Sequence, residues 1–175
     1  MNNIIFIISQ IIGFIAFFVS LMAYHRNKKE KILASMILSN VLNLIHYFLL
    51  GAYSGCVTKV MGIARDSFVI LKGKKKALSS NIFLLIFILI YLVIGIFTYD
   101  NIFSILPLVA AIMYIIPIWN GNEITVKKTA FVCYFLWLIY NIFVFSIAGV
   151  ISNIISIIST FFAVKNEMCN KSGIK

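Results

Sequence analysis

Apolar runs of membrane-spanning length recur along the whole chain. A helix needs about 20 such residues to cross the hydrocarbon core of a bilayer. Backbone groups in hydrocarbon must be paired within their own segment, so continuous apolar runs favour helices, whereas a membrane β-barrel would alternate apolar and polar residues. We therefore predict an all-α integral membrane protein with seven transmembrane helices, at 4–24, 32–51, 56–72, 80–98, 102–119, 129–146 and 148–165.

The composition excludes a water-soluble domain and does not indicate nucleic acid as a partner. Hydrophobic residues make up 62% of the chain and charged residues 11%, against about half and about a quarter in soluble domains. Any function must therefore reside within the lipid bilayer or at its faces. The lipid bilayer is thus the first expected partner of the protein. The net charge of +10 does not indicate nucleic acid, because the basic residues fall between apolar runs and are interpreted as topogenic charge.

The basic residues predict the orientation of the chain. With seven spans every basic cluster lies on one side of the membrane, and the connections on the other side contain no Lys or Arg. The positive-inside rule then places the N-terminus outside and the C-terminus in the cytoplasm. The clusters are Arg26, Lys28, Lys29 and Lys31; Lys72, Lys74, Lys75 and Lys76; Lys127 and Lys128; and Lys165, Lys171 and Lys175.

The seven predicted spans divide into two groups of three joined by a single span. Both groups begin on the outside, so a repeat that relates them is parallel, and the joining span restores the direction. Alignment of Gly55 with Gly149 sets the groups in register, 94 residues apart, without a gap. We expect a first three-helix bundle at 1–76, a linking helix at 77–100, a second bundle at 101–166 and a short cytoplasmic tail at 167–175.

Polar residues within the predicted spans form stripes that face something other than lipid. Asn43 and His46 share a face of the second span, Trp137 and Asn141 lie on the corresponding face of the sixth, and Asn153 lies on the seventh. Such stripes either hold helices together or line a wet cavity, and both interpretations stay open. The amides have more donors and acceptors than a neighbouring helix usually satisfies, whereas His46 is interpreted more readily as a buried hydrogen-bonding residue than as a proton relay.

Three charged residues lie inside the predicted third span. Lys59 is close enough to the outer border for its ammonium to reach the lipid headgroups. Arg65 lies about 10 Å from the inner border at ~1.5 Å per residue, and Asp66 points about 100° away around the helix, so a simple pair is not expected. An intramembrane charge is by default a functional candidate. Arg65 stays open between a tie between helices and a contact to an anionic substrate group.

No enzyme signature is present in the sequence. There is no glycine-rich phosphate loop and no HExxH motif, and Asp66 is the only acid within a predicted span. Cys56, Cys133 and Cys169 are odd in number and form no CxxC spacing, so neither a disulfide framework nor a metal site is predicted. We therefore expect a protein that is not an enzyme and that needs no cofactor.

Several segments resemble the YgjV family of bacterial inner-membrane proteins, over about residues 8–165. The resemblance implies a multi-pass protein of the bacterial inner, or cytoplasmic, membrane. The segments that carry it are Gln10–Phe17, His46–Gly55 with Arg65 downstream, Leu106–Pro107, Trp137–Asn141 and Ser146–Gly149.

More distantly, the plan of three, one and three spans is similar to SWEET-type sugar carriers and PnuC-type vitamin-precursor transporters. In those, the substrate sits between two three-helix bundles, against an aromatic residue or Asn of the second helix and an Asn of the third. Trp137 and Asn153 match that pattern in the second half, whereas Asn43 and Lys59 depart from it in the first. The resemblance implies transport of a small polar or anionic metabolite, by a single chain or a homodimer.

The sequence thus supports two functions of different classes. The first is a transporter whose midplane site is lined by Asn43, His46, Arg65, Trp137, Asn141 and Asn153. The alternative is a non-transporting structural or regulatory membrane protein that packs against a partner. A cavity on which the polar residues converge near mid-depth would favour transport, and dry close packing of the same positions would favour the alternative.

Overall fold

The computed structural model describes residues 3–24, 29–72, 78, 80–120 and 123–171. Within these ranges the chain forms seven α-helices and one short 3-10 helix, and no strand. The prediction of an all-helical protein is confirmed. The elements are α1 (Asn3–Tyr24), α2 (Lys29–Leu49), α3 (Tyr53–Lys72), α4 (Asn81–Phe97), η2 (Ile102–Ser104), α5 (Ile105–Asn120), α6 (Glu123–Phe143) and α7 (Ile147–Lys171).

A helix occupies each predicted span, but length and composition identify only some of these helices as membrane-crossing. Two helical stretches, Ala34–Leu49 and Asn81–Phe97, are apolar but shorter than the four stretches that meet the length for a membrane span. Helix α3 is neither a long nor a short apolar stretch, because Lys59, Arg65 and Asp66 interrupt its apolar sequence. The four stretches in the described ranges that are long and apolar enough are Asn3–Met22, Ile102–Trp119, Ile124–Phe143 and Ile147–Lys165.

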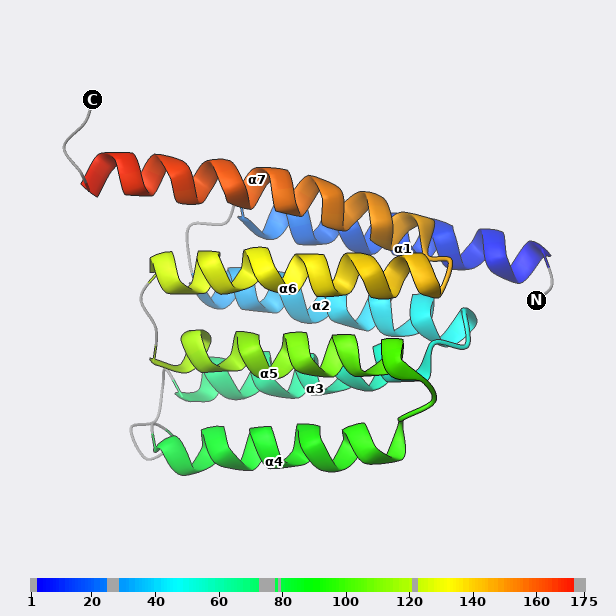
Figure 1. Cartoon of the computed structure of the whole chain (residues 1–175), viewed down its shortest axis with the longest axis horizontal. Helices are drawn as coiled ribbons and strands as arrows, with labels where there is room; N and C mark the ends of the chain where they lie inside the picture. The colour runs from blue at the N-terminus through cyan, green and yellow to red at the C-terminus, as the bar shows by residue number, and fades with distance from the viewer. Residues whose placement is uncertain (1–2, 25–28, 73–77, 79, 121–122, 172–175) are drawn as a thin grey trace.

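The helices form two rows that face one another, with one helix at the edge. Helices α1, α2 and α3 pack side by side in sequence order, and α5, α6 and α7 do the same (Figure 1). Helix α1 packs against α7 and α3 packs against α5, while the rings of Tyr47 in α2 and Trp137 in α6 stack between the rows. Helix α4 covers α3 and α5 at one edge. The space between the rows is therefore bounded by helices of both halves.

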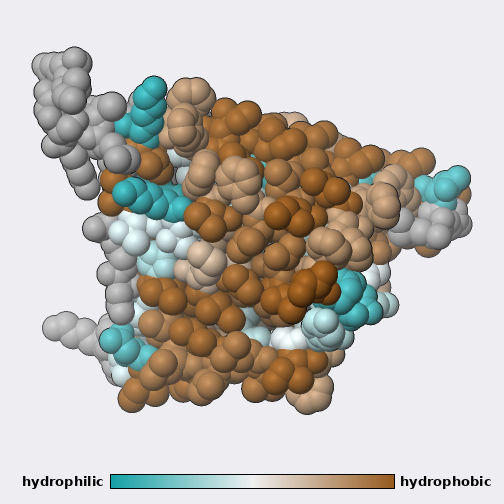
Figure 2. Space-filling model, in the orientation of Figure 1, coloured by the Kyte–Doolittle hydropathy of each residue, from teal (hydrophilic) through white to brown (hydrophobic). Residues whose placement is uncertain are grey.

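The outer surface of the bundle is predominantly apolar. On the face shown in Figure 2, hydrophobic residues cover most of the area between the two ends, and hydrophilic residues gather toward the ends. Helix α4 is the extreme case, because Tyr91 is its only buried residue and residues such as Leu89 and Ile96 are exposed. A contiguous apolar surface of this extent is costly in water and is suited to lipid.

The two ends of the bundle differ in charge. Successive helices run in opposite directions, so the α2–α3, α4–α5 and α6–α7 connections share one end, and these contain no Lys or Arg (Figure 1). Lys72, Lys127, Lys128 and Lys165 lie toward the other end, which we call the basic end. Helix α1 begins at the first end and α7 finishes at the basic end. The basic residues that lie outside the described ranges are Arg26, Lys28, Lys74, Lys75, Lys76 and Lys175.

The α2–α3 and α6–α7 turns are closed by the same pattern of backbone hydrogen bonds. Every residue of the second turn lies 94 positions after its counterpart in the first. Gly51 and Phe145, also 94 apart, have positive φ angles of 70° and 55°, a conformation that is uncommon for a residue other than glycine. The N–H groups bond from Leu50 to His46, Gly51 to Phe48 and Ala52 to Tyr47, and from Val144 to Tyr140, Phe145 to Ile142 and Ser146 to Asn141.

A pair of side-chain hydrogen bonds repeats in the same register. The Ser39 hydroxyl in α2 donates to the carbonyl of Ala16 in α1, at 2.9 Å. The Cys133 thiol in α6 donates to the carbonyl of Ala110 in α5, at 3.3 Å. Both members of the second pair lie 94 positions after those of the first. The two halves therefore share an inter-helix contact as well as a turn.

Candidate functional site

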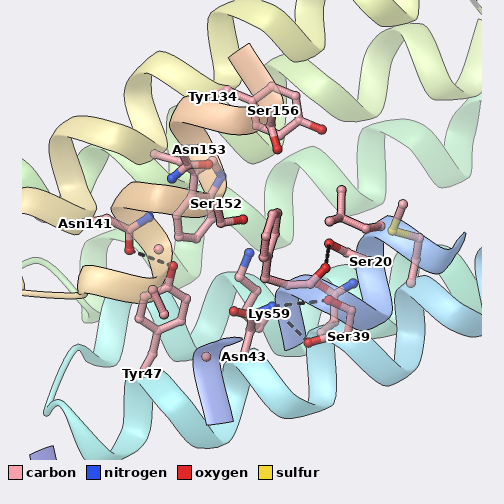
Figure 3. A pocket seen from close by; sticks show the side chains of 18 residues that line it. Ser20, Ser39, Asn43, Tyr47, Lys59, Tyr134, Asn141, Ser152, Asn153 and Ser156 are labelled. Atoms are coloured by element: carbon pink, nitrogen blue, oxygen red, sulfur yellow. Dashed lines mark hydrogen bonds between the residues drawn. The ribbon is translucent and has the colours of Figure 1, made fainter. Parts of the chain in front are cut away.

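A cavity of about 180 Å³ lies between the two rows, and we call it the central cavity (Figure 3). It extends from the level of Tyr47 and Asn141 toward the basic end, as far as Leu21 near the end of α1. Its volume is comparable with the ~150 Å³ of a cavity that encloses benzene, so a molecule with a single ring fits. Four of the predicted site residues line it: Asn43, Trp137, Asn141 and Asn153.

Among the residues that the structure describes, Lys59 supplies the only charge in the lining of the central cavity. Its Nζ atom lies 3.8 Å from the centroid of the Trp137 ring and 5.8 Å from that of Tyr47. The expectation that Lys59 snorkels to the headgroups is therefore wrong. The face of α3 that carries Lys59 is turned toward α6, so the long side chain contacts the Trp137 and Tyr47 rings instead of the lipid headgroups.

The aromatic rings compensate the Lys59 ammonium only in part. A desolvated cation–π contact contributes about 2 kcal/mol, whereas the removal of an ion from water costs several kcal/mol. Among the described residues no carboxylate lies within ion-pair distance of Lys59, since the ion pair that the structure contains there joins Arg65 and Asp66. The central cavity therefore carries a net positive charge that its own walls do not neutralise.

The amides of the central cavity differ in how far the protein satisfies them. Asn43 donates to the Ser39 carbonyl at 2.9 Å, and the Asn141 carbonyl oxygen accepts the Tyr47 hydroxyl at 2.8 Å (Figure 3). Asn153 is only 8% exposed, and its side chain makes no hydrogen bond with any described residue. A buried amide without a protein partner is costly unless water or a ligand satisfies it. Asn153 is therefore free to contact a guest in the cavity.

A second cavity, of about 270 Å³, adjoins the first and is called the lateral cavity. The two cavities share five lining residues: Met36, Asn40, Lys59, Tyr134 and Trp137. Most of the lateral cavity is apolar, and Arg65 and Asp66 add charges to its lining beside the shared Lys59. Several lining residues of the two cavities are again 94 positions apart: Phe17 and Ala111, Ser20 and Tyr114, Ser39 and Cys133, Thr58 and Ser152, and Gly62 and Ser156.

Arg65 and Asp66 form an ion pair in the wall of the lateral cavity, where no simple pair was expected. A guanidinium nitrogen of Arg65 lies 2.8 Å from Asp66 Oδ1, and Arg65 Nε donates to the same oxygen at 2.9 Å. Asn40 donates to the other carboxylate oxygen at 3.2 Å, from α2. The expectation considered only the direction in which the residues leave the helix. The arginine side chain is long enough to bend back across that angle.

His46 lines neither cavity. Its ring is 1% exposed, and its Nδ1 and Nε2 atoms form hydrogen bonds with the Ser9 carbonyl at 2.6 Å and the Ser146 hydroxyl at 2.7 Å. Both ring nitrogens thus contact protein, and the two contacts lie in different halves of the chain. His46 is a buried hydrogen-bonding residue, which agrees with that interpretation of the sequence. Its predicted place beside the other site residues is not observed.

His46 belongs to a layer of hydrogen bonds that joins the halves at the end opposite the basic one. The Tyr140 hydroxyl accepts from the Ser54 hydroxyl and from the Gly55 N–H, each at 2.9 Å. The Gln10 amide bonds to the backbone of the α6–α7 turn. We call Gln10, His46, Tyr47, Tyr140 and Asn141 the closed layer. Gln10 was not among the predicted site residues, although it is a conspicuous amide within the first apolar run.

Comparison with known proteins assigns the chain to a family. No curated protein and no solved structure matches the chain. A family model described as bacterial inner membrane protein matches residues 7–166. The matched segment includes every residue that lines the central and lateral cavities. The chain belongs to the YgjV family of bacterial inner membrane proteins.

Proposed function

We propose that the protein is a transporter that carries a small polar or anionic molecule across the inner membrane. The observation that carries the proposal is the central cavity, a polar space with one cation that lies between two rows of apolar helices. Polar groups between apolar, membrane-spanning helices cost free energy, so such a cavity favours a functional role. Rocking of one row against the other would expose the cavity to each side of the membrane in turn.

The proposal includes seven membrane spans arranged as a parallel repeat of two three-helix bundles, with α4 as the linking helix. Support comes from the two matching turns and from the matching Ser39 and Cys133 hydrogen bonds, all in the 94-residue register. In the same register α1 corresponds to α5 and α3 corresponds to α7, so the α1–α7 contact is the counterpart of the α3–α5 contact. A repeat of this kind gives two bundles that can move against each other around a shared site.

We further propose that the basic end faces the cytoplasm and that the N-terminus lies outside. The clustering of lysines at one end supports this orientation through the positive-inside rule. The closed layer then lies at the outer face, above the central cavity, and separates the cavity from the cell exterior. In this arrangement the structure corresponds to a state in which the outer entrance is shut.

The rival, a membrane protein that only packs against a partner, is less well supported. Dry packing of the polar positions would favour it, whereas Asn43, Trp137 and Asn153 line one cavity and Arg65 lines the adjoining one. No bond-making step is assigned to these residues, and we propose a function without catalysis or cofactor. A single chain supplies the whole lining of the central cavity, so the proposal does not depend on a homodimer.

Uptake by proteoliposomes tests the proposed function. Purified protein is reconstituted and offered a panel of radiolabelled sugars, organic acids, amino acids and nucleosides. We expect saturable uptake of at least one member, reduced at least tenfold by Asn153→Ala. The matched control is Ile154→Ala, because Ile154 is the next residue on α7 and is exposed on the outer surface. Absence of saturable uptake across the panel, or equal uptake by the two variants, would contradict the proposal.

A further inference from the structure

We propose that the central cavity binds a small organic acid with a single carboxylate, and that Lys59 is the residue that recognises its charge. The inference rests on the transport function proposed above and deepens it, because it names the class of substrate. It is carried by the placement of one cation, one unpartnered amide and two aromatic rings around one cavity.

The charge of the cavity favours a monoanion. Lys59 is the only charged residue among those that line the central cavity, and the nearby guanidinium of Arg65 is already paired with Asp66. A guest with one negative charge would neutralise the cavity, whereas a cation would be repelled and a neutral guest would leave the ammonium uncompensated. A doubly charged phosphate would exceed the single positive charge. The balance therefore points to one carboxylate.

The groups around the ammonium can donate hydrogen bonds to a carboxylate. Figure 3 shows Lys59 between Asn43 on one side and Ser152 and Asn153 on the other. Asn153 has an amide that no described residue satisfies, and a hydroxyl such as that of Ser152 can rotate to donate. A carboxylate has two oxygens that accept from such donors. An ammonium and an amide on opposite sides would hold both oxygens.

The aromatic rings in the cavity wall indicate that the part of the substrate beyond its carboxylate is apolar. The rings of Tyr47 and Trp137 stack with their centroids 5.7 Å apart and an angle of 27° between their planes. Both rings line the central cavity, and they give one part of its wall an aromatic, apolar surface that an apolar body can contact. The volume of about 180 Å³ limits that body to roughly one ring or a short chain. Benzoate is accordingly a suitable probe, with benzamide as its neutral counterpart of the same shape.

Binding of this pair tests the inference without requiring transport. The whole chain is purified in dodecyl maltoside, a neutral detergent that adds no competing lipid phosphate, and binding is measured by isothermal titration calorimetry. We expect wild-type protein to bind benzoate at least tenfold more tightly than benzamide. Lys59→Gln should abolish this preference, and Lys59→Arg, which keeps the charge, should retain it. The control Lys128→Gln removes an exposed lysine outside both cavities and should leave the preference unchanged.

The outcomes separate this inference from the proposed transport function. Equal binding of the two probes, a preference that persists in folded Lys59→Gln protein, or no binding of benzoate at millimolar concentration would each overturn the carboxylate site. Saturable uptake of a neutral compound in the proteoliposome panel would then leave the transport function standing. A charge-dependent preference for benzoate without uptake of any panel member would instead support the anion site and contradict transport.

Discussion

Separation of the Arg65–Asp66 pair is expected to destabilise the fold more than any loss of an exposed charge. The side chains are 11% and 4% exposed, so removal of one partner leaves the other as a poorly solvated charge. Such a break costs about 3–5 kcal/mol. We therefore expect Arg65→Gln and Asp66→Asn each to lower the free energy of unfolding by about that amount. Asn40 limits the loss for Arg65→Gln, since its amide still donates to the carboxylate.

The double variant distinguishes a coupled pair from two independent contributions. With both charges removed, two neutral amides remain, and the loss should fall short of the summed single losses by at least ~2 kcal/mol. Unfolding is followed by circular dichroism during titration of the micelles with sodium dodecyl sulfate. Lys128→Gln, at an exposed position, should stay within about 0.5 kcal/mol of wild type. Additive losses in the double variant, or single losses below ~1 kcal/mol, would refute the reasoning.

Two further predictions concern packing and topology. A Cβ on Gly55 would lie 2.9 Å from the Tyr140 hydroxyl and 3.0 Å from the Tyr47 ring, so Gly55→Ala should cost about 1–3 kcal/mol in the same titration. Gly95→Ala, which meets a movable leucine tip, should cost less than half as much, and equal losses would contradict the packing argument. Reporter fusions should place the C-terminus in the cytoplasm and the N-terminus outside, and both termini on one side would disprove the orientation.

The sequence was sufficient for the helices and for four residues of the central cavity, because both depend on regular spacing. Apolar runs predicted most helix bounds to within three residues, as α5 (Ile105–Asn120) illustrates against the expected 102–119, but α6 begins six residues earlier and α7 ends six residues later than expected. Asn43, Trp137 and Asn153 meet in one cavity because helical periodicity puts them on inward faces. Only the face matters for such residues, and the face can be deduced from residue numbers.

The charged residues of α3 were harder to predict, because their positions depend on long side chains. Lys59 was assigned to the headgroups and lies over the Trp137 ring. Arg65 was not expected to reach Asp66, and the two form a close ion pair. A lysine or arginine has several rotatable bonds between the helix and its charge. Where that charge settles depends on which rings and carboxylates the neighbouring helices bring near, and a single sequence does not contain that information.

The two cavities differ in the side chains that occupy corresponding positions of the proposed repeat. The two turns and the two inter-helix bonds match in the 94-residue register, and under the proposed repeat the differences between the cavities come from side chains. In the 94-residue register, Lys59 corresponds to Asn153, and Arg65 and Asp66 correspond to Ser159 and Thr160. The charged residues among those that line the two cavities, Lys59, Arg65 and Asp66, therefore all lie in the first half.

Under the proposed repeat, corresponding positions of the two cavities therefore carry different side chains. The Arg65–Asp66 pair lines the lateral cavity alone, whereas Lys59, over the Trp137 ring, lines both cavities. Because Lys59 borders both spaces, an anion bound in the central cavity would draw the ammonium away from the Trp137 ring, which also lines both. In the proposed transport cycle, a bound substrate would thereby act on a contact between α3 and α6, which belong to the two rows that are proposed to move against each other.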